Sequence, residues 1–231
     1  MPIPIYTIKN LHISKGDKFQ LYIKQFDIYR GACYVFSGSM GSGKSTLLDT
    51  IYSQKKVDKG EIKFEEKNLQ SYSKRNYKKN IAIVPQVLSV KWGTVENYII
   101  KIIRSYSYIK NPDKRFKEIV KKMKIEKLLK RKVRSLTAGE LRWVVLAANI
   151  AADSKVLFID GYEQHLGKED IQILNKIIYR KINYDGITLI ASTRNKELFN
   201  KLASVTITLD NGRITSLRSF SKKREKYKKK K

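Results

Sequence analysis

A glycine-rich segment, GSMGSGKST (residues 38–46), combines residue types and spacing that suit a phosphate chain. A glycine, four further residues and then Gly-Lys-Ser form the pattern of a phosphate-binding loop. Glycines let the backbone wrap closely around phosphate oxygens, and the N-terminus of a following helix adds a positive dipole end. We therefore expect the whole segment to bind the phosphates of a nucleoside triphosphate: Gly38, Ser39, Met40, Gly41, Ser42, Gly43, Lys44, Ser45 and Thr46.

Side chains of this segment and of a downstream acid have expected roles of their own. Lys44 is expected to reach the outer phosphates as a point charge, and Ser45 to supply an oxygen to Mg²⁺. Asp160 ends the apolar run VLFI (156–159), so its carboxylate should lie where a buried strand emerges. The sequence thus predicts a nucleoside triphosphate and Mg²⁺ as cofactors, with Asp160 holding the ion through water opposite Ser45.

The loop needs a strand before it and a helix after it, and the surrounding pattern predicts both. The apolar segment ACYVFSG (32–38) indicates a buried strand, and the residues after Gly43 read as a helix. Upstream, alternating segments over 3–13 and 18–28 indicate strands, and 59–69 resembles a hairpin. KNIAIVPQ (79–86) indicates another buried strand.

The pattern turns helical between about residues 94 and 152 and then returns to alternation. Phe116, Ile119, Val120 and Met123 recur at helical spacing, with lysines on the opposite face. After residue 153 we expect, in order, a strand, a helix over 168–182, a strand over 186–192, a helix over 195–203 and a hairpin over 204–217 that turns at Asn211-Gly212. The fold class predicted is α/β.

The composition is strongly basic, with 49 Lys and Arg against 21 Asp and Glu and a formal net charge of +28. A polyanionic partner would explain this charge, and so would drift on a solvated surface under an AT-rich genome; the sequence leaves both open. Residues 219–231 read as a basic disordered tail that could contact anionic lipid. Cys33 is interpreted as a core residue, and we expect neither a membrane span nor a signal peptide.

The motifs occur in an order that resembles the nucleotide-binding domain of ABC ATPases over about residues 3–216. VPQ, ending at Gln86, stands where that family has its Q-loop. LTAGE (136–140) resembles the family signature Leu-Ser-Gly-Gly-Gln and precedes Asp160 at the expected distance. The resemblance implies a P-loop NTPase core, an N-terminal antiparallel β-subdomain and a helical subdomain inserted at about 87–152, within one domain spanning 1–218.

The resemblance also implies how the domain would work. Two such domains would pair head to tail, as a homodimer or heterodimer, with ATP between the phosphate loop of one and the signature of the other. Ser45, Gln86 and Asp160 would then surround Mg²⁺. The residues expected to face the partner's γ-phosphate are Thr137, Ala138 and Gly139. Such a subunit would dock on an integral membrane subunit at the cytoplasmic face of a membrane.

The sequence departs from the family pattern where the family carries its catalytic groups. Gly161 replaces the glutamate that polarises the attacking water, and Arg194 replaces the switch histidine. Losing a general base costs typically about 10²–10⁴-fold in rate. Glu163 could compensate, or a standard partner subunit could complete one good site. Gln86, Glu163 and Arg194 are therefore the catalytic candidates.

These observations favour an ATP-binding subunit that couples ATP binding, with at most slow hydrolysis, to a conformational change in a separate membrane subunit. An ATP-gated dimerisation module that barely hydrolyses, or a degenerate partner of a standard subunit, is the second hypothesis. A nucleic-acid-associated protein is the third. Because nothing but the basicity supports the third, nucleic acid is not an expected partner.

Overall fold

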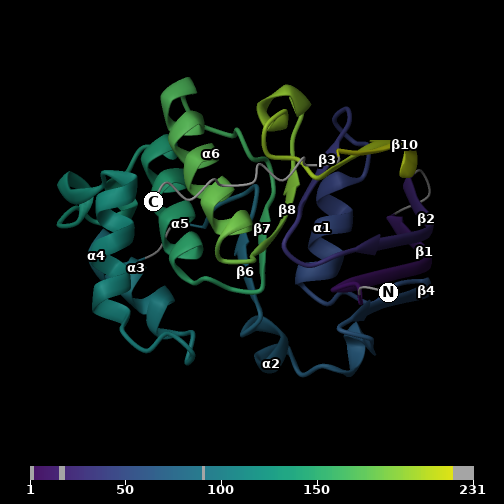
Figure 1. The fold of residues 1–231 in the computed structure, drawn as a ribbon, viewed down its shortest axis with the longest axis horizontal. Helices are drawn as coiled ribbons and strands as arrows, with labels where there is room; N and C mark the ends of the chain where they lie inside the picture. Colours follow the sequence, from purple (N-terminus) through teal and green to yellow (C-terminus); the bar gives the residue numbers. More distant parts are fainter. Residues whose placement is uncertain (1–2, 16–18, 90–91, 221–231) are drawn as a thin grey trace, which may run out of the picture.

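The computed structural model describes residues 3–15, 19–89 and 92–220, and these form a ten-stranded sheet flanked by helices (Figure 1). Along the sheet the strands follow the order β5-β4-β1-β2-β10-β9-β3-β8-β7-β6. Their bounds are β1 Tyr6–Lys15, β2 Phe19–Ile28, β3 Cys33–Ser37, β4 Lys59–Phe64, β5 Lys67–Asn68, β6 Ile81–Val84, β7 Val156–Ile159, β8 Thr188–Ser192, β9 Val205–Asp210 and β10 Arg213–Ser219.

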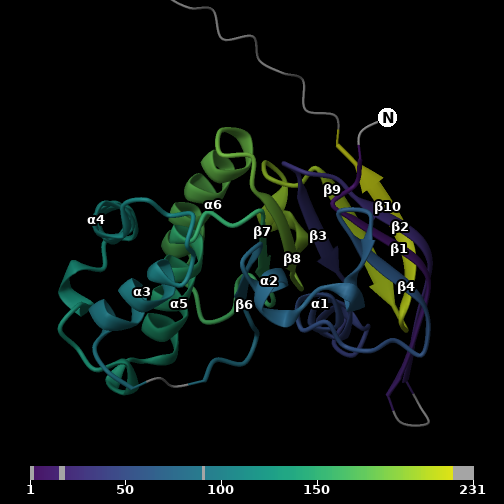
Figure 2. The same cartoon turned by 90° about the horizontal axis from the view of Figure 1, so that it is seen from below.

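The structure contains both α-helices and short 3-10 helices. The α-helices are α1 Lys44–Tyr52, α2 Lys74–Lys78, α3 Val95–Arg104, α4 Pro112–Met123, α5 Ala138–Ala151 and α6 Lys168–Asn183. The 3-10 helices are η1 Leu69–Ser71, η2 Glu126–Leu128, η3 Val133–Ser135 and η4 Lys196–Phe199. Helices α3 and α4 lie at the end of the molecule opposite the antiparallel strands, as Figures 1 and 2 both show.

The sheet has a parallel half and an antiparallel half. Strands β9, β3, β8, β7 and β6 pair in parallel, whereas β1 pairs antiparallel with both β2 and β4. This arrangement confirms the predicted fold class, an α/β core with N-terminal antiparallel strands and a helical subdomain. Because parallel strands end at the same edge, the residues after β3, β6, β7 and β8 are brought together there.

Alternating side chains of the parallel strands feed two separate cores. On β7, Val156 and Phe158 pack with α1 and the N-terminal strands, whereas Leu157 and Ile159 pack with α5 and α6. Such strands, buried on both faces, read as continuous apolar runs. This explains why VLFI carries no polar residue before Asp160.

The helical subdomain is held together largely around α5, which contacts both α3 and α4. Phe116, Ile119, Val120 and Met123 of α4 are all buried, as their spacing predicts. Helix α4 ends at Met123 because Lys124 adopts a left-handed conformation, with φ 53°. Residues between α4 and α5 form only 3-10 turns, so the predicted helical region is interrupted there.

At the C-terminal end, one prediction from the sequence is confirmed and another is wrong. The Asn211-Gly212 turn joins β9 and β10 with positive φ at both residues, as expected for this hairpin. The predicted helix over 195–203 is wrong: only the 3-10 helix η4 forms there. Strand β10 extends through Ser219, one residue into the predicted tail, and residues 221–231 lie outside the described residues.

Among the described residues, the structure contains no helix long and apolar enough to cross a membrane.

The chain's two tryptophans provide a matched test of the helical subdomain. Trp143 is 9% exposed and its Nε1 donates to Met123 O at 2.9 Å, joining α5 to α4, whereas Trp92 is 86% exposed. We expect Trp143→Ala to lower the free energy of unfolding by about 3–5 kcal/mol. Trp92→Ala should cost less than about 1 kcal/mol, since it loses only an exposed contact with Arg134. Urea unfolding measures both, and equal losses would contradict this packing.

Candidate functional site

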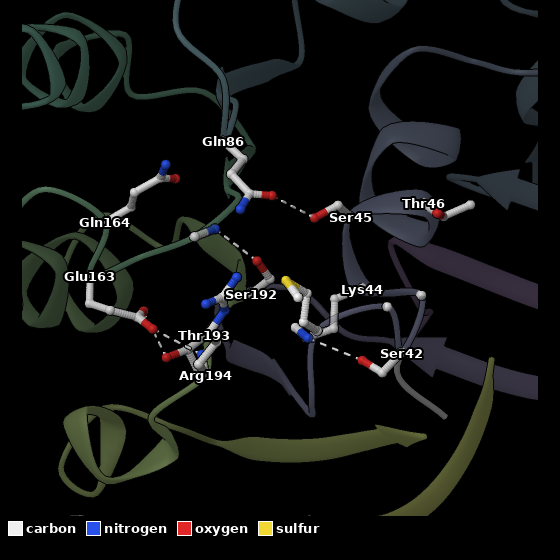
Figure 3. A pocket seen from close by; sticks show the side chains of 14 residues that line it. Ser42, Lys44, Ser45, Thr46, Gln86, Glu163, Gln164, Ser192, Thr193 and Arg194 are labelled. Carbon is white, nitrogen blue, oxygen red and sulfur yellow. Dashed lines mark hydrogen bonds between the residues drawn. The ribbon is translucent and has the colours of Figure 1, made fainter. Parts of the chain in front are cut away.

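A cavity of about 520 Å³ opens at the edge where the parallel strands end (Figure 3). The phosphate loop and the start of α1 form one side of it, and the residues after β7 and β8 form the other. The lining residues are Met40, Gly41, Ser42, Gly43, Lys44, Ser45, Thr46, Gln86, Gly161, Glu163, Gln164, Ser192, Thr193 and Arg194. Most of the predicted loop thus lines the cavity, while Gly38 and Ser39 line an adjoining hollow with Arg194.

Gly38 turns the chain from β3 into the phosphate loop in a conformation that requires glycine. Its φ is +144°, and a Cβ there would lie 2.1 Å from the carbonyl oxygen of Leu209. The loop closes at Gly43, the N-cap of α1, so the free N–H groups at the start of α1 face the loop. The predicted strand, loop and helix are therefore all present in the required order.

The Lys44 ammonium lies inside the loop. Its Nζ donates to Gly38 O at 2.8 Å, to Ser39 O at 2.7 Å and to Ser42 Oγ at 3.0 Å. Burial lowers the pKa of Lys44, and the nearby positive charge of Arg194 lowers it further. Two cations that face one cavity favour an anion between them.

Oxygen atoms from three separate segments converge beside the loop. Ser45 Oγ lies 3.1 Å from Gln86 Oε1 and 3.1 Å from Asp160 Oδ1. Asp160 is only 3% exposed, and it lies beneath the residues that line the cavity. A hydroxyl, an amide oxygen and a carboxylate are ligands that Mg²⁺ accepts, so this group of atoms fits the ion. The described residues contain no cluster of three or more His, Cys, Asp or Glu that would suit another metal site.

Ser192, the last residue of β8, holds the Asp160 carboxylate in place. Its Oγ donates a short hydrogen bond to Asp160 Oδ1 and accepts one from Gly161 N at 2.8 Å. Tyr162, fully buried, adds a second link, because its N–H donates to Ser192 O at 2.9 Å. The turn after β7 is thereby fixed to the end of β8.

Arg142 holds the same turn from the other side. Its guanidinium, fully buried, donates to Pro85 O at 2.6 Å, to Asp160 O at 2.9 Å and to Gly161 O at 2.8 Å. Burial lowers the pKa of Arg142 to about 10, against the opposing pull of Asp160 and Glu163, so the group stays charged near pH 7. Arg142 therefore joins α5 to the segment before Gln86 and to the segment that carries Asp160.

Gly161 adopts a left-handed backbone, with φ +68°. A Cβ on Gly161 would lie 2.9 Å from Gln164 Oε1 and 3.5 Å from Gln86 Cγ. A side chain at this position would be strained and would meet an amide already in its space.

The remaining catalytic candidates, Glu163 and Arg194, contact each other through the Glu163 carboxylate and the Arg194 backbone. Glu163 Oε2 accepts from Thr193 Oγ1 at 2.8 Å, and its Oε1 accepts from Arg194 N at 2.9 Å. Figure 3 shows Glu163 and Arg194 on the side opposite Ser45. Both predicted residues line the cavity, but the Glu163 carboxylate serves to hold the loop after β8.

The signature-like segment lies outside the cavity. Thr137 caps α5 in a capping box with Glu140, and both Thr137 and Ala138 are exposed. Gly139 packs closely, since a Cβ there would lie 2.9 Å from His165 O. The structure therefore does not bring Thr137, Ala138 and Gly139 to the chain's own phosphate loop.

Sequence reasoning missed Arg142, Ser192 and Gln164. Arg142 carried a usable signal, because a lone arginine among the apolar residues of LRWVVLAANI must pair its charge once buried. Ser192 and Gln164 gave no such signal, since their contacts depend on how the turns after β7 and β8 meet.

Comparison with known proteins identifies the family to which this chain belongs. The profile of the ABC transporter family matches residues 23–162. The phosphonates import ATP-binding protein PhnC of Fusobacterium nucleatum is 28% identical over 225 residues, covering 91% of this chain and 90% of PhnC. The cell division ATP-binding protein FtsE of Streptococcus pneumoniae is 29% identical, covering 77% of this chain and 79% of FtsE.

Solved structures share the fold. An ATP-binding subunit of an ABC transporter superposes with a TM-score of 0.84 at 19% identity, covering 94% of this chain and 90% of that one. A dimeric ATP-binding cassette in a post-hydrolysis state, bound to ADP and phosphate, gives 0.80 at 21% identity, covering 94% and 99%. The chain belongs to the ABC transporter family, as an ATP-binding subunit of that type of complex and a member of its ATPases.

Proposed function

We propose that this chain binds ATP and Mg²⁺ in the cavity beside α1 and passes the resulting conformational change to a separate membrane subunit. The observation that carries the proposal is the convergence of Ser45, Gln86 and Asp160 beside the Lys44 ammonium, within a loop of phosphate-binding pattern. A structural turn would need none of these polar groups at one edge of the sheet.

Groups of this chain that now bond to one another could bond to a triphosphate instead. Lys44 Nζ now donates to loop carbonyls and to Ser42 Oγ, and it would donate instead to outer phosphate oxygens. The free N–H groups at the start of α1 would donate to the inner phosphates. Arg194 would add charge-assisted hydrogen bonds from the opposite side.

Mg²⁺, when bound, would neutralise charge on the outer phosphates. Ser45 Oγ would be its direct protein ligand, and Gln86 would orient next to it. Asp160 would act through a water, as a buried carboxylate held by Ser192. The distance of 3.1 Å between Asp160 Oδ1 and Ser45 Oγ supports these two roles.

We propose that the signature-like segment serves a second subunit. Thr137 and Ala138 are exposed at the start of α5, away from the chain's own cavity. A second ATP-binding subunit, identical or different, could present its γ-phosphate to Thr137, Ala138 and Gly139. The Ala138 methyl group, at a position where the family pattern has glycine, would narrow the approach of that phosphate.

A membrane subunit is the proposed mechanical partner, which would place the chain at the cytoplasmic face of a membrane. The residues that follow Gln86 support this, because Val87 is 85% exposed and Trp92 is 86% exposed. Exposed apolar residues next to a nucleotide-sensing glutamine suit a docked helix. The name of PhnC refers to import and that of FtsE to cell division, so these relatives do not point to one cargo.

A second candidate function is an ATP-gated module whose own site hydrolyses slowly. Gly161 offers no carboxylate, and the Glu163 carboxylate already holds Thr193 and the Arg194 backbone. Such a site would bind ATP, retain it and serve as a degenerate partner of a standard subunit. Contact of the basic tail with anionic lipid stays a prediction from its sequence.

Replacing Lys44 tests the phosphate site. We expect Lys44→Ala to weaken ATP binding by roughly 10- to 150-fold, because charged hydrogen bonds contribute about 1.5–3 kcal/mol. Lys78→Ala, on the exposed surface of α2, is the matched control and should bind as the unaltered chain does. Calorimetric titration measures both, and equal ATP affinity in the two variants would refute the assignment.

Replacing Asp160 tests the ion site. We expect Asp160→Asn to reduce Mg²⁺ affinity in the presence of ATP by about 10–100-fold, which is typical when a group that orients a metal's inner ligands is lost. Asp113→Asn, at an exposed position on α4, should leave Mg²⁺ affinity unchanged. ATP titrations with Mg²⁺ and with EDTA give the comparison. An unchanged Mg²⁺ dependence in Asp160→Asn would contradict the site.

Restoring an acid at residue 161 tests the backbone argument. We expect Gly161→Glu to lose about 1–2 kcal/mol of stability, because a side chain in a left-handed conformation is strained. Its Cβ would also displace the Gln164 amide, so we expect no gain in ATP turnover over the unaltered chain. Urea unfolding and phosphate release measure the two effects. A clear gain in turnover in Gly161→Glu would contradict the backbone argument, and brisk, equal turnover in both proteins would overturn the slow-site proposal.

A further inference from the structure

We propose that the exposed face of α6 binds a single strand of nucleic acid, with its phosphates against lysine and arginine side chains and its bases against tyrosine rings. This binding activity goes beyond the proposed ATP site and uses none of the residues that line the ATP cavity. Net charge alone gave such a partner no place on the molecule, whereas the fold gathers exposed cations and aromatic rings around two adjoining hollows.

The two hollows lie on either side of α6. One, of about 700 Å³, opens between α6 and the residues of and after η4, and the other, of about 680 Å³, opens between α6 and the C-terminal end of α4. Lys176, Arg180 and Tyr184 line both, so the hollows adjoin over the exposed face of this helix. Figure 1 shows α6 between α4 and the yellow-green segment that follows β8. We call the two hollows together the α6 surface.

The α6 surface is strongly positive, because five exposed cations line it and none of them makes an ion pair with a described residue. Asp185 is neutralised by Lys181, whose Nζ lies 2.8 Å from Asp185 Oδ2. Glu197 is then the one other acid among the described lining residues. Such a concentration of positive charge attracts a chain of phosphates. The five cations are Lys122, Lys124, Lys176, Arg180 and Lys201.

Two tyrosine rings lie among these cations. Tyr179 is 45% exposed and Tyr184 is 67% exposed, and both line the hollow beside η4. Single strands bind where a positively charged groove follows the phosphate backbone and aromatic rings stack on unpaired bases. An acidic peptide or an anionic lipid headgroup offers charge but no base, and a duplex hides the faces of its bases. The rings therefore favour a single strand over these other polyanions.

The walls of the hollow beside η4 are held at a fixed spacing by Asn175. Its Oδ1 accepts from the Tyr162 hydroxyl at 2.7 Å, and its Nδ2 donates to Leu198 O at 3.0 Å. Leu174, the preceding residue of α6, is fully buried and anchors the helix to the core. A preformed hollow spares a ligand the entropy that ordering its binding site would cost. The α6 surface therefore has its shape before a ligand binds.

The first test removes two charges from the α6 surface and the same two residue types from another place. Lys176→Ala with Arg180→Ala is compared with Lys74→Ala with Arg75→Ala, on the exposed surface of α2, so that both double variants carry the same net charge. Fluorescence anisotropy follows the binding of a labelled single strand of about 12 nucleotides to the full chain over a range of salt. Residues 221–231 are the same in every variant, so their basic side chains do not distinguish the variants.

We expect the double variant on α6 to bind roughly tenfold more weakly at low salt. Its plot of log K against log salt should also be less steep by about 1.4, because each phosphate contact with a single strand contributes about 0.7. The double variant on α2 should bind as the unaltered chain does. An equal loss in the two double variants would overturn the proposal, since net charge alone would then explain the binding.

The second test concerns the ring of Tyr184. We expect Tyr184→Ala to weaken binding of the single strand by about 5- to 150-fold, the range for the loss of one stacked base. Tyr184→Phe keeps the ring and should keep the affinity. Unchanged affinity in Tyr184→Ala would contradict stacking on this residue and overturn the proposal.

Competition against the labelled strand separates the classes of polyanion. An unlabelled single strand should displace it more effectively than a duplex, a poly-glutamate peptide or a phosphatidylglycerol vesicle at the same total charge. Equal displacement by any of these three would overturn the proposal. ATP affinity should be the same in all variants, so a failure of this proposal is distinct from a failure of the proposed ATP site.

Discussion

The turn after β7 depends on one buried cation, the guanidinium of Arg142. A buried charge is costly unless hydrogen bonds compensate it, and here the carbonyls of Pro85, Asp160 and Gly161 do so. Holding the last two carbonyls fixes the peptide groups on both sides of the Gly161 Cα. Gly161 therefore sits in a left-handed conformation, the Asp160 carboxylate points toward Ser45, and the Gln164 amide fills the space beside them. The positions of Asp160, Gly161 and Gln164 around the cavity are thus linked to this interaction.

The same arginine connects the site to the rest of the molecule. Arg142 lies on α5, whose first residues carry the signature-like segment, and its contact at Pro85 adjoins Gln86. The two cores on either face of the parallel strands keep α1 and α5 on opposite sides of the sheet. Ser45 bonds both Gln86 and Asp160, and Arg142 bonds the carbonyls of Pro85 and Asp160, so these contacts join the phosphate loop to α5. This chain of contacts gives a physical route from nucleotide to helical subdomain.

Much of the fold was predictable because its signals are local. Apolar runs marked β3, β6, β7 and β8, the glycine-rich loop marked the start of α1, and Asn211-Gly212 marked the last hairpin. The predicted helix over 195–203 failed because Asn195 caps a single 3-10 turn and Asn200 ends it. Within the site, Lys44, Ser45, Gln86 and Asp160 were foreseen from spacing and resemblance. Arg142, Ser192 and Gln164 act through contacts between segments distant in sequence, and the left-handed backbone of Gly161 follows from those contacts too.

We propose above all that this site binds ATP well and hydrolyses it slowly. The most direct measurement is the nucleotide recovered from the purified chain after mixing with Mg²⁺ and a limiting amount of ATP, followed over time. We expect bound nucleotide to be still mostly ATP after minutes, well beyond the turnover time of a typical enzyme with kcat of about 10 s⁻¹. Complete conversion to ADP within a few seconds, or no ATP retained at all, would contradict it.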